Sequence, residues 1–176
     1  MIIIPARLAS TRMPNKILRE INGVPMFVAT ARRVSAADEP ENIVKFREFC
    51  EKNAERAFMF SCFKFIGSEL ADDKNLVKVV TDDAGYALYF SRSRIPFDRA
   101  PFDAYKAHLG IYGYSVKSLK EFCTLATSSL ENTEKLEQLR ALENGKKIAM
   151  LEVESQSIGI DSEEDYQRAL AKFGKK

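Results

Sequence analysis

The feature that most restricts the fold of this chain is an apolar run at residues 2–4 that passes directly into a basic loop. Three consecutive isoleucines are typical of a strand buried on both faces, as in the parallel sheet of an α/β protein. The loop at residues 5–16 is rich in Pro, Arg, Ser and Thr. Ligands of open α/β sheets bind at the carboxyl ends of strands, so this loop is the first candidate for a binding site.

Helical and extended patterns alternate along the rest of the chain. We predict helices beginning at Pro25, over 41–51, 117–125 and 133–144, and from 161 onward, and strands at 57–63, 110–114 and 148–153. Asn22-Gly23 predicts a turn, and residues 77–91 predict a β-hairpin extension. The alternation indicates an α/β fold with an open, mostly parallel sheet flanked by helices, in a single domain over residues 1–176.

The charge and the cysteine content argue against several classes of protein. Lys and Arg total 27 and Asp and Glu total 25, so the net charge of +2 gives no reason to expect nucleic acid or a membrane as a partner. Three cysteines without CxxC spacing and a single histidine argue against zinc and disulfides. The N-terminal run is too short for a signal peptide, and no run approaches the ~18 apolar residues of a spanning helix. We therefore expect a cytoplasmic location.

The opening loop carries three cations, Arg7, Arg12 and Lys16, with Ser10 and Thr11 between them. Guanidinium forks and an ammonium group can neutralise a polyphosphate. The loop lacks the glycines of a Walker loop. Judged by charge alone, a solvated surface loop is about as good an interpretation, since surface Lys and Arg are ordinary.

The spacing Pro-Ala-Arg-x-x-Ser-Thr-Arg-x-Pro-x-Lys resembles the nucleotide-binding signature of sugar nucleotidylyltransferases, most closely of the 3-deoxy-manno-octulosonate (Kdo) cytidylyltransferases. Further blocks resemble this family in matching order, at 38–40, 75–80, 86–92, 95–96, 108–114, 134–140 and 159–165. The resemblance implies a nucleotide-diphospho-sugar transferase-like (Rossmann-like) fold, usually homodimeric. It implies transfer of CMP from CTP to Kdo with release of pyrophosphate, for lipopolysaccharide biosynthesis. It also implies that Arg7, Ser10, Arg12 and Lys16 bind the nucleotide, with Arg7 and Lys16 catalytic.

The resemblance implies a Mg²⁺ site at Asp38 and Asp161, the aspartates of the DEP and G-x-D motifs. Mg²⁺ takes one or two carboxylates alongside phosphate oxygens. Without the family, Asp161 is better interpreted as a helix cap because it precedes Ser162 at a predicted helix start. Asp38-Glu39-Pro40 alone fits an ordinary turn.

Five residues are candidates for the sugar side. As a lone histidine on a Gly-rich aromatic strand, His108 is more often structural than catalytic, and Tyr112 on the same strand usually just packs. Glu137 and Gln138 fall off the leucine stripe of their predicted helix, so solvent exposure would explain them. Arg92 ends a buried strand, where a sugar carboxylate or a structural salt bridge would pair it. The resemblance implies that His108 contacts the sugar and that Glu137 and Gln138 hydrogen-bond its hydroxyls.

One stretch departs from the family pattern. Family members place an apolar strand directly before the DEP motif, but residues 31–37 read as the end of a helix. A segment with an Asp-His-x-Ser-Gly-Thr signature is also absent. An internal segment is therefore missing near residues 35–37, either because this sequence omits residues of the protein, which we favour, or through a real deletion. The alternatives to an active enzyme for Kdo are a truncated chain that only binds a nucleotide or partner, and a cytidylyltransferase for another acidic sugar.

Overall fold

The computed structural model describes residues 2–3, 18–21, 23–25, 40–154 and 163–173, and it divides the chain into two compact units. The first contains Met1–Ile4 and Lys45–Glu154, and the second contains Pro5–Val44 and Ser155–Lys176. Each unit is described by itself. In the described residues, no helix is both long and apolar enough to cross a membrane.

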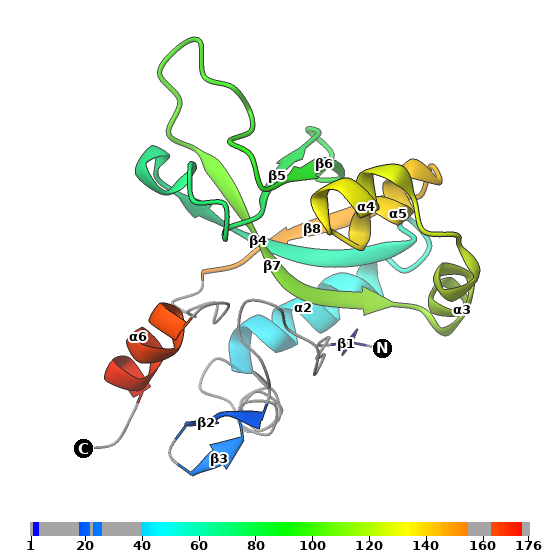
Figure 1. Cartoon of the computed structure of the whole chain (residues 1–176). Helices are drawn as coiled ribbons and strands as arrows, with labels where there is room; N and C mark the ends of the chain where they lie inside the picture. The colour runs from blue at the N-terminus through cyan, green and yellow to red at the C-terminus, as the bar shows by residue number, and fades with distance from the viewer. Residues whose placement is uncertain (1, 4–17, 22, 26–39, 155–162, 174–176) are drawn as a thin grey trace. The chain divides into compact units, whose positions relative to one another are not determined.

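The first unit is built on a six-stranded mixed sheet (Figure 1). Its strands are β1 (Ile2–Ile3), β4 (Met59–Ile66), β5 (Lys78–Thr81), β6 (Ala87–Ser91), β7 (Tyr105–Tyr114) and β8 (Ile148–Glu152). The order is β6-β5-β7-β4-β8, and β1 also pairs with β7. The expected open sheet with flanking helices is confirmed.

The expectation of mostly parallel pairing is wrong for the described strands. Only β4 and β8 pair in parallel, whereas β7 runs antiparallel to β1, β4 and β5, and β5 to β6. Strand β7 accounts for three of these antiparallel pairs, because it runs against its neighbours on both edges. A hairpin joins β5 to β6, which makes that pair antiparallel as well. The predicted hairpin at 77–91 is confirmed.

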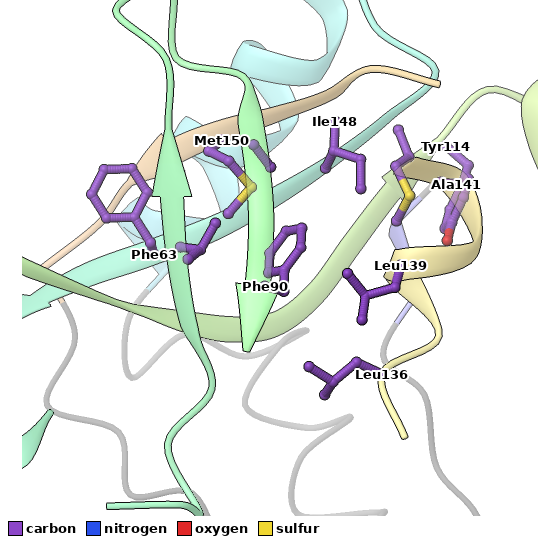
Figure 2. Close-up of a cluster of buried hydrophobic side chains, with 11 residues drawn as sticks. Phe63, Phe90, Tyr114, Leu136, Leu139, Ala141, Ile148 and Met150 are labelled. Carbon is purple, nitrogen blue, oxygen red and sulfur yellow. The ribbon is translucent and has the colours of Figure 1, made fainter. Parts of the chain in front are cut away.

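Different helices cover the two faces of the sheet. One face packs against α3 (Val116–Thr124), α4 (Ser129–Glu134) and α5 (Gln138–Glu143), and Figure 2 shows its core, which includes Phe63, Phe90, Tyr114, Leu136, Leu139 and Ile148. The opposite face packs against α2 (Pro40–Lys52) through a second cluster with Phe46, Phe60 and Cys62. Strand β4 contributes side chains to both clusters, because successive side chains of a strand point to opposite faces of the sheet.

Glycine at position 113 allows α2 to approach β7 closely. A Cβ built on Gly113 would lie 2.6 Å from Sγ of Cys50 and 3.3 Å from the Phe46 ring. Only hydrogen fits there, so this backbone position sets the spacing between the helix and the sheet.

The prediction of a single helix over 133–144 is wrong in part, because two short helices occupy the region. Helix α4 ends at Glu134, and the next residue, Lys135, has a left-handed φ of 56° and ψ of 44°; α5 begins three residues after Lys135. The break turns both Leu136 and Leu139 into the core, where they are 6% and 0% exposed. Burial of these two leucines offsets the cost of the left-handed lysine.

The second unit contains β2 (Glu20–Ile21), β3 (Val24–Pro25) and α6 (Glu163–Phe173). Gly23, with φ of 72°, lies in the predicted turn between the strands. The hydroxyl of Tyr166 donates to the carbonyl of Glu20, and the Arg19 guanidinium pairs with Glu163. The helix predicted to begin at Pro25 is wrong at that residue, because Pro25 pairs with Glu20 as the last residue of β3; the rest of the predicted helix lies outside the described residues.

Candidate functional site

Strand β7 contains a bulge opposite Ser61. Ser61 pairs with Tyr112, but the next β4 residue, Cys62, pairs with Leu109, so β7 carries two extra residues there. The bulge places the Ser61 hydroxyl 2.8 Å from the carbonyl of Ile111 and 3.2 Å from that of Leu109. Ser61 is completely buried, and these carbonyls satisfy its proton.

The bulge also brings His108 close to Tyr112. Residues four apart on a regular strand are separated by about 13 Å. Here their β4 partners, Phe63 and Ser61, are only two residues apart, and the centroids of the His108 and Tyr112 rings lie 5.6 Å from each other. Phe90 packs edge-on against His108 at 5.0 Å. Bulges commonly re-aim side chains beside active sites.

Hydrogen bonding and burial both act on the protonation of His108. Its Nε2 lies 2.8 Å from Oγ of Ser61. When the single proton of Ser61 is donated to the carbonyl of Ile111 or Leu109, Nε2 of His108 donates to Oγ of Ser61 and Nδ1 is left as an acceptor. Burial lowers the pKa of His108 to about 3, so the ring is neutral at pH 7. The side chain therefore offers a lone pair rather than a charge.

The turn between α4 and α5 delivers Gln138 to the same place. Tyr112 donates its hydroxyl to Oε1 of Gln138 at 3.2 Å. Gln138 is 3% exposed, and its Nε2 has no hydrogen-bond partner among the described residues. The interpretation of Gln138 as solvent-exposed is therefore wrong, whereas Glu137 is exposed. An unpaired buried amide costs about 1–3 kcal/mol, which marks it as a candidate ligand contact.

A buried ion pair stabilises this turn. Nε and Nη2 of Arg140 donate to the two carboxylate oxygens of Glu131, at 2.7 and 2.5 Å. The pair joins α4 to α5 across the left-handed Lys135, and Glu131 is 6% exposed. Its hydrogen bonds with Arg140 lower the pKa of Glu131. Such a bidentate pair restrains the residues between its partners, including Glu137 and Gln138.

The guanidinium of Arg92 binds backbone carbonyls. Nε donates to the carbonyl of Glu134 at 3.3 Å, and Nη1 to that of Lys74 at 3.1 Å. Within the described residues, no carboxylate forms a salt bridge with it. The structural salt bridge suggested as an alternative is thus not found in this part of the chain, while the sugar-carboxylate role stays a prediction.

The structure therefore brings together three of the five candidate sugar residues, His108, Tyr112 and Gln138. The predicted nucleotide and metal residues lie outside the described part of the chain: Arg7, Ser10, Arg12, Lys16, Asp38 and Asp161. The described residues contain no group of three or more His, Cys, Asp or Glu able to hold a metal ion. Sequence reasoning missed Ser61, although a serine within the apolar run at 57–63 was the available signal.

The family model of the cytidylyltransferases matches residues 1–45 and 39–148, so the chain is a cytidylyltransferase by class. It is 39% identical to the 3-deoxy-manno-octulosonate cytidylyltransferase of a Nitratiruptor species, covering 98% of this chain and 99% of the relative. The enzyme of the same name from Helicobacter pylori (strain HPAG1) is 41% identical, with 98% and 97% covered. The chain belongs to the 3-deoxy-manno-octulosonate cytidylyltransferase family.

Two solved structures share the fold. A CMP:2-keto-3-deoxy-manno-octonic acid synthetase complexed with CTP superposes with a TM-score of 0.83 at 23% identity, and 95% of each chain is covered. A glucose-1-phosphate thymidylyltransferase from Bacillus anthracis gives 0.52 at 15% identity, covering 92% of this chain and 87% of that one. At these identities the likeness concerns the fold alone.

The alignments are longer than the chain. The comparison with the Nitratiruptor relative extends over 236 positions, although this chain has 176 residues. The relative therefore carries residues that have no counterpart here. The family model likewise matches in two segments, 1–45 and 39–148, rather than in one.

Proposed function

We propose that this chain transfers CMP from CTP to 3-deoxy-D-manno-octulosonate, giving CMP-Kdo and pyrophosphate. The observation that carries the proposal is the 39–41% identity to enzymes named for this activity over nearly the whole chain. The anomeric hydroxyl of the sugar attacks the α-phosphorus of CTP, and pyrophosphate leaves. No covalent intermediate with the protein is required.

The polar face beside the β7 bulge supports a polyhydroxylated substrate. Nδ1 of neutral His108 can accept a hydrogen bond from a sugar hydroxyl, and the amide of Gln138 can donate one. The hydroxyl of Tyr112 donates to the amide oxygen of Gln138, which leaves the amide nitrogen for the ligand. Glu137 and Arg92 complete the proposed sugar site, Arg92 through the sugar carboxylate.

The nucleotide side of the proposal rests on the opening loop. Arg7, Ser10, Arg12 and Lys16 would bind the triphosphate, and Arg7 and Lys16 would stabilise the leaving pyrophosphate. Asp38 and Asp161 would hold Mg²⁺, since two carboxylates are hard oxygen donors of the kind this ion prefers. When bound, the ion would neutralise charge on the triphosphate.

We also propose a cytoplasmic homodimer that acts in lipopolysaccharide biosynthesis. Phe97 is 79% exposed and Phe102 is 38% exposed, on the loop between β6 and β7. Arg94 bonds both oxygens of Asp98, at 3.1 and 2.8 Å, which restrains the loop on either side of Phe97. A large apolar side chain held in solvent supports a contact with a second copy. Loss of the dimer in Phe97→Asp, measured by light scattering, would support this; a monomeric unmodified protein would refute it.

The competing function is a non-catalytic chain that binds a nucleotide or a partner. It is favoured by the residues that the relatives carry and this chain lacks. Pyrophosphate release in the presence of CTP, Kdo and Mg²⁺ decides between the two, with Asp161→Asn as the inactive control. A folded protein that releases no pyrophosphate refutes the transferase. If another acidic sugar were turned over faster than Kdo, the chain would still be a cytidylyltransferase, and only the proposed sugar substrate would be different.

A further inference from the structure

Lys78 is fully buried near the edge of the sheet, yet every proton of its ammonium group has an acceptor. Its Nζ donates to the carbonyls of Leu76 at 2.6 Å, Arg92 at 2.7 Å and Asp73 at 2.8 Å. Burial lowers the pKa of Lys78, and Asp73 opposes this shift. A buried charge is tolerated only where its hydrogen bonds are complete, so the three carbonyls are fixed around it.

Glu134 binds the same strand end from the other side. One carboxylate oxygen accepts from the hydroxyl of Ser91 at 2.5 Å, and the other accepts from the backbone N–H of Arg92 at 3.0 Å. Glu134 lies at the end of α4, before the turn that leads to Gln138. The carboxylate therefore ties the end of β6 to the helical side of the site.

The backbone of Arg92 is consequently held at both polar atoms. Its carbonyl faces the Lys78 ammonium, and its N–H faces the Glu134 carboxylate. The guanidinium then reaches the carbonyls of Lys74 and Glu134. Lys78 and Arg92 also place two positive charges near each other, since Arg92 lowers the pKa of Lys78.

We propose that Lys78 and Glu134 are positioning residues that fix the backbone of Arg92 and thereby the place where its guanidinium meets the carboxylate of an acidic sugar. The proposal rests on the proposed function. It assigns a task to a buried lysine and a carboxylate that the transfer reaction does not itself use. Neither side chain touches the substrate; both act through Arg92.

Steady-state kinetics with CTP and Kdo varied separately test this role. Lys78→Met keeps the length of the side chain, and Glu134→Gln keeps its shape, which provides a second variant if the first does not fold. Lys78→Met removes three charge-assisted hydrogen bonds, and Glu134→Gln removes the charge from two. We expect the KM for Kdo to rise about tenfold to hundredfold in Lys78→Met, with the KM for CTP within twofold. Lys106→Met is the matched control, because its Nζ binds Thr81 at 2.6 Å and not Arg92.

A double-mutant cycle separates positioning from general stability. If Lys78 acts through Arg92, the variant Lys78→Met/Arg92→Met has the same KM for Kdo as Arg92→Met alone. Multiplicative effects, equal changes in both KM values, or an equal effect of Lys106→Met would overturn the proposal.

Amide hydrogen exchange provides a readout that needs no turnover. The amide of Arg92 should be protected in the unmodified chain and should exchange at least tenfold faster in Lys78→Met and in Glu134→Gln. Unchanged exchange overturns the positioning role even if the enzyme is active. An unmodified chain that releases no pyrophosphate refutes the proposed function, and the exchange rates still decide whether these residues anchor Arg92.

Discussion

Ser61 and His108 are 47 residues apart in the chain, and their side chains meet at 2.8 Å inside the sheet. The contact exists because β4 and β7 pair along most of their length and β7 bulges at this point. A hydroxyl, an imidazole, a phenol and a primary amide thus form one polar series beside an apolar cluster; Ser61 and Gln138 are buried, and His108 and Tyr112 are partly buried.

The low pKa of the partly buried His108 makes stability depend on pH. The folded pKa of His108 is about 3, whereas an unfolded histidine titrates near 6.5. Below pH 6.5 the unfolded chain binds a proton that the folded chain does not, so stability falls as the pH decreases toward 3. We expect the free energy of unfolding to drop by about 2 kcal/mol more in the unmodified chain than in His108→Gln between pH 7 and pH 5. Urea titrations at both pH values measure this, and identical drops would contradict it.

Substitution of Gln138 should impair sugar binding with little effect on the free energy of unfolding. Gln138→Met removes an unpaired buried amide nitrogen, which costs about 1–3 kcal/mol, but also the acceptor of the Tyr112 hydroxyl. These effects oppose each other, so we expect a change in unfolding free energy below about 1 kcal/mol. The KM for Kdo should rise at least tenfold while the KM for CTP stays constant. A large loss of stability with normal kinetics would show that the amide is purely structural.

The glycines of β7 form a matched pair for a packing test. A methyl group on Gly113 would overlap Cys50, whereas nothing lies within 4 Å of a Cβ on Gly110. We expect Gly113→Ala to destabilise the protein by about 1–3 kcal/mol through overpacking, and Gly110→Ala to have little effect. Thermal unfolding of both variants decides; equal melting temperatures would contradict the close approach of α2.

The ion pair between Glu131 and Arg140 should be sensitive to acid. Its hydrogen bonds with Arg140 lower the folded pKa of Glu131, so the stabilisation is present above the unfolded pKa and is lost as the pH falls through the folded value. Glu131→Gln should be less stable at pH 7, with a difference that shrinks as the pH falls below the unfolded pKa of about 4.5. Glu48→Gln is a control, because Glu48 is exposed on α2 and forms no ion pair within the described residues. A pH-independent difference would refute this account.

Local patterns predicted the elements whose determinants are local. The stripe of Ile43, Phe46 and Phe49 predicted α2, and the apolar segments at 77–80 and 86–90 predicted the β5–β6 hairpin. Strand β7 was predicted only at 110–114, because the polar residues Lys106 and His108 interrupt the apolar pattern of its first half. The whole of β7, from Tyr105 to Tyr114, forms the antiparallel pairs with β1, β4 and β5.

Long-range contacts explain what the sequence could not reveal. The leucines at 136, 139 and 142 fit one helix, and nothing at Lys135 indicates a left-handed residue; the break is set by how Leu136 and Leu139 fill the core. The burial of Gln138 follows from that break. The hydrogen-bond partners of Arg92 could not be foreseen either, because they are the carbonyl of Lys74, the ammonium of Lys78 and the carboxylate of Glu134, which are up to 42 residues away.

The bulge in β7 has a chemical effect beyond its geometry. One of its extra residues, Ile111, offers a carbonyl to the Ser61 hydroxyl, and a serine that donates to this carbonyl accepts from Nε2 of His108. If the serine donated to the imidazole instead, Nε2 would be the acceptor and Nδ1 would carry the proton. Two additional residues in one strand thus act on which ring nitrogen of His108 can accept a hydrogen bond from a ligand.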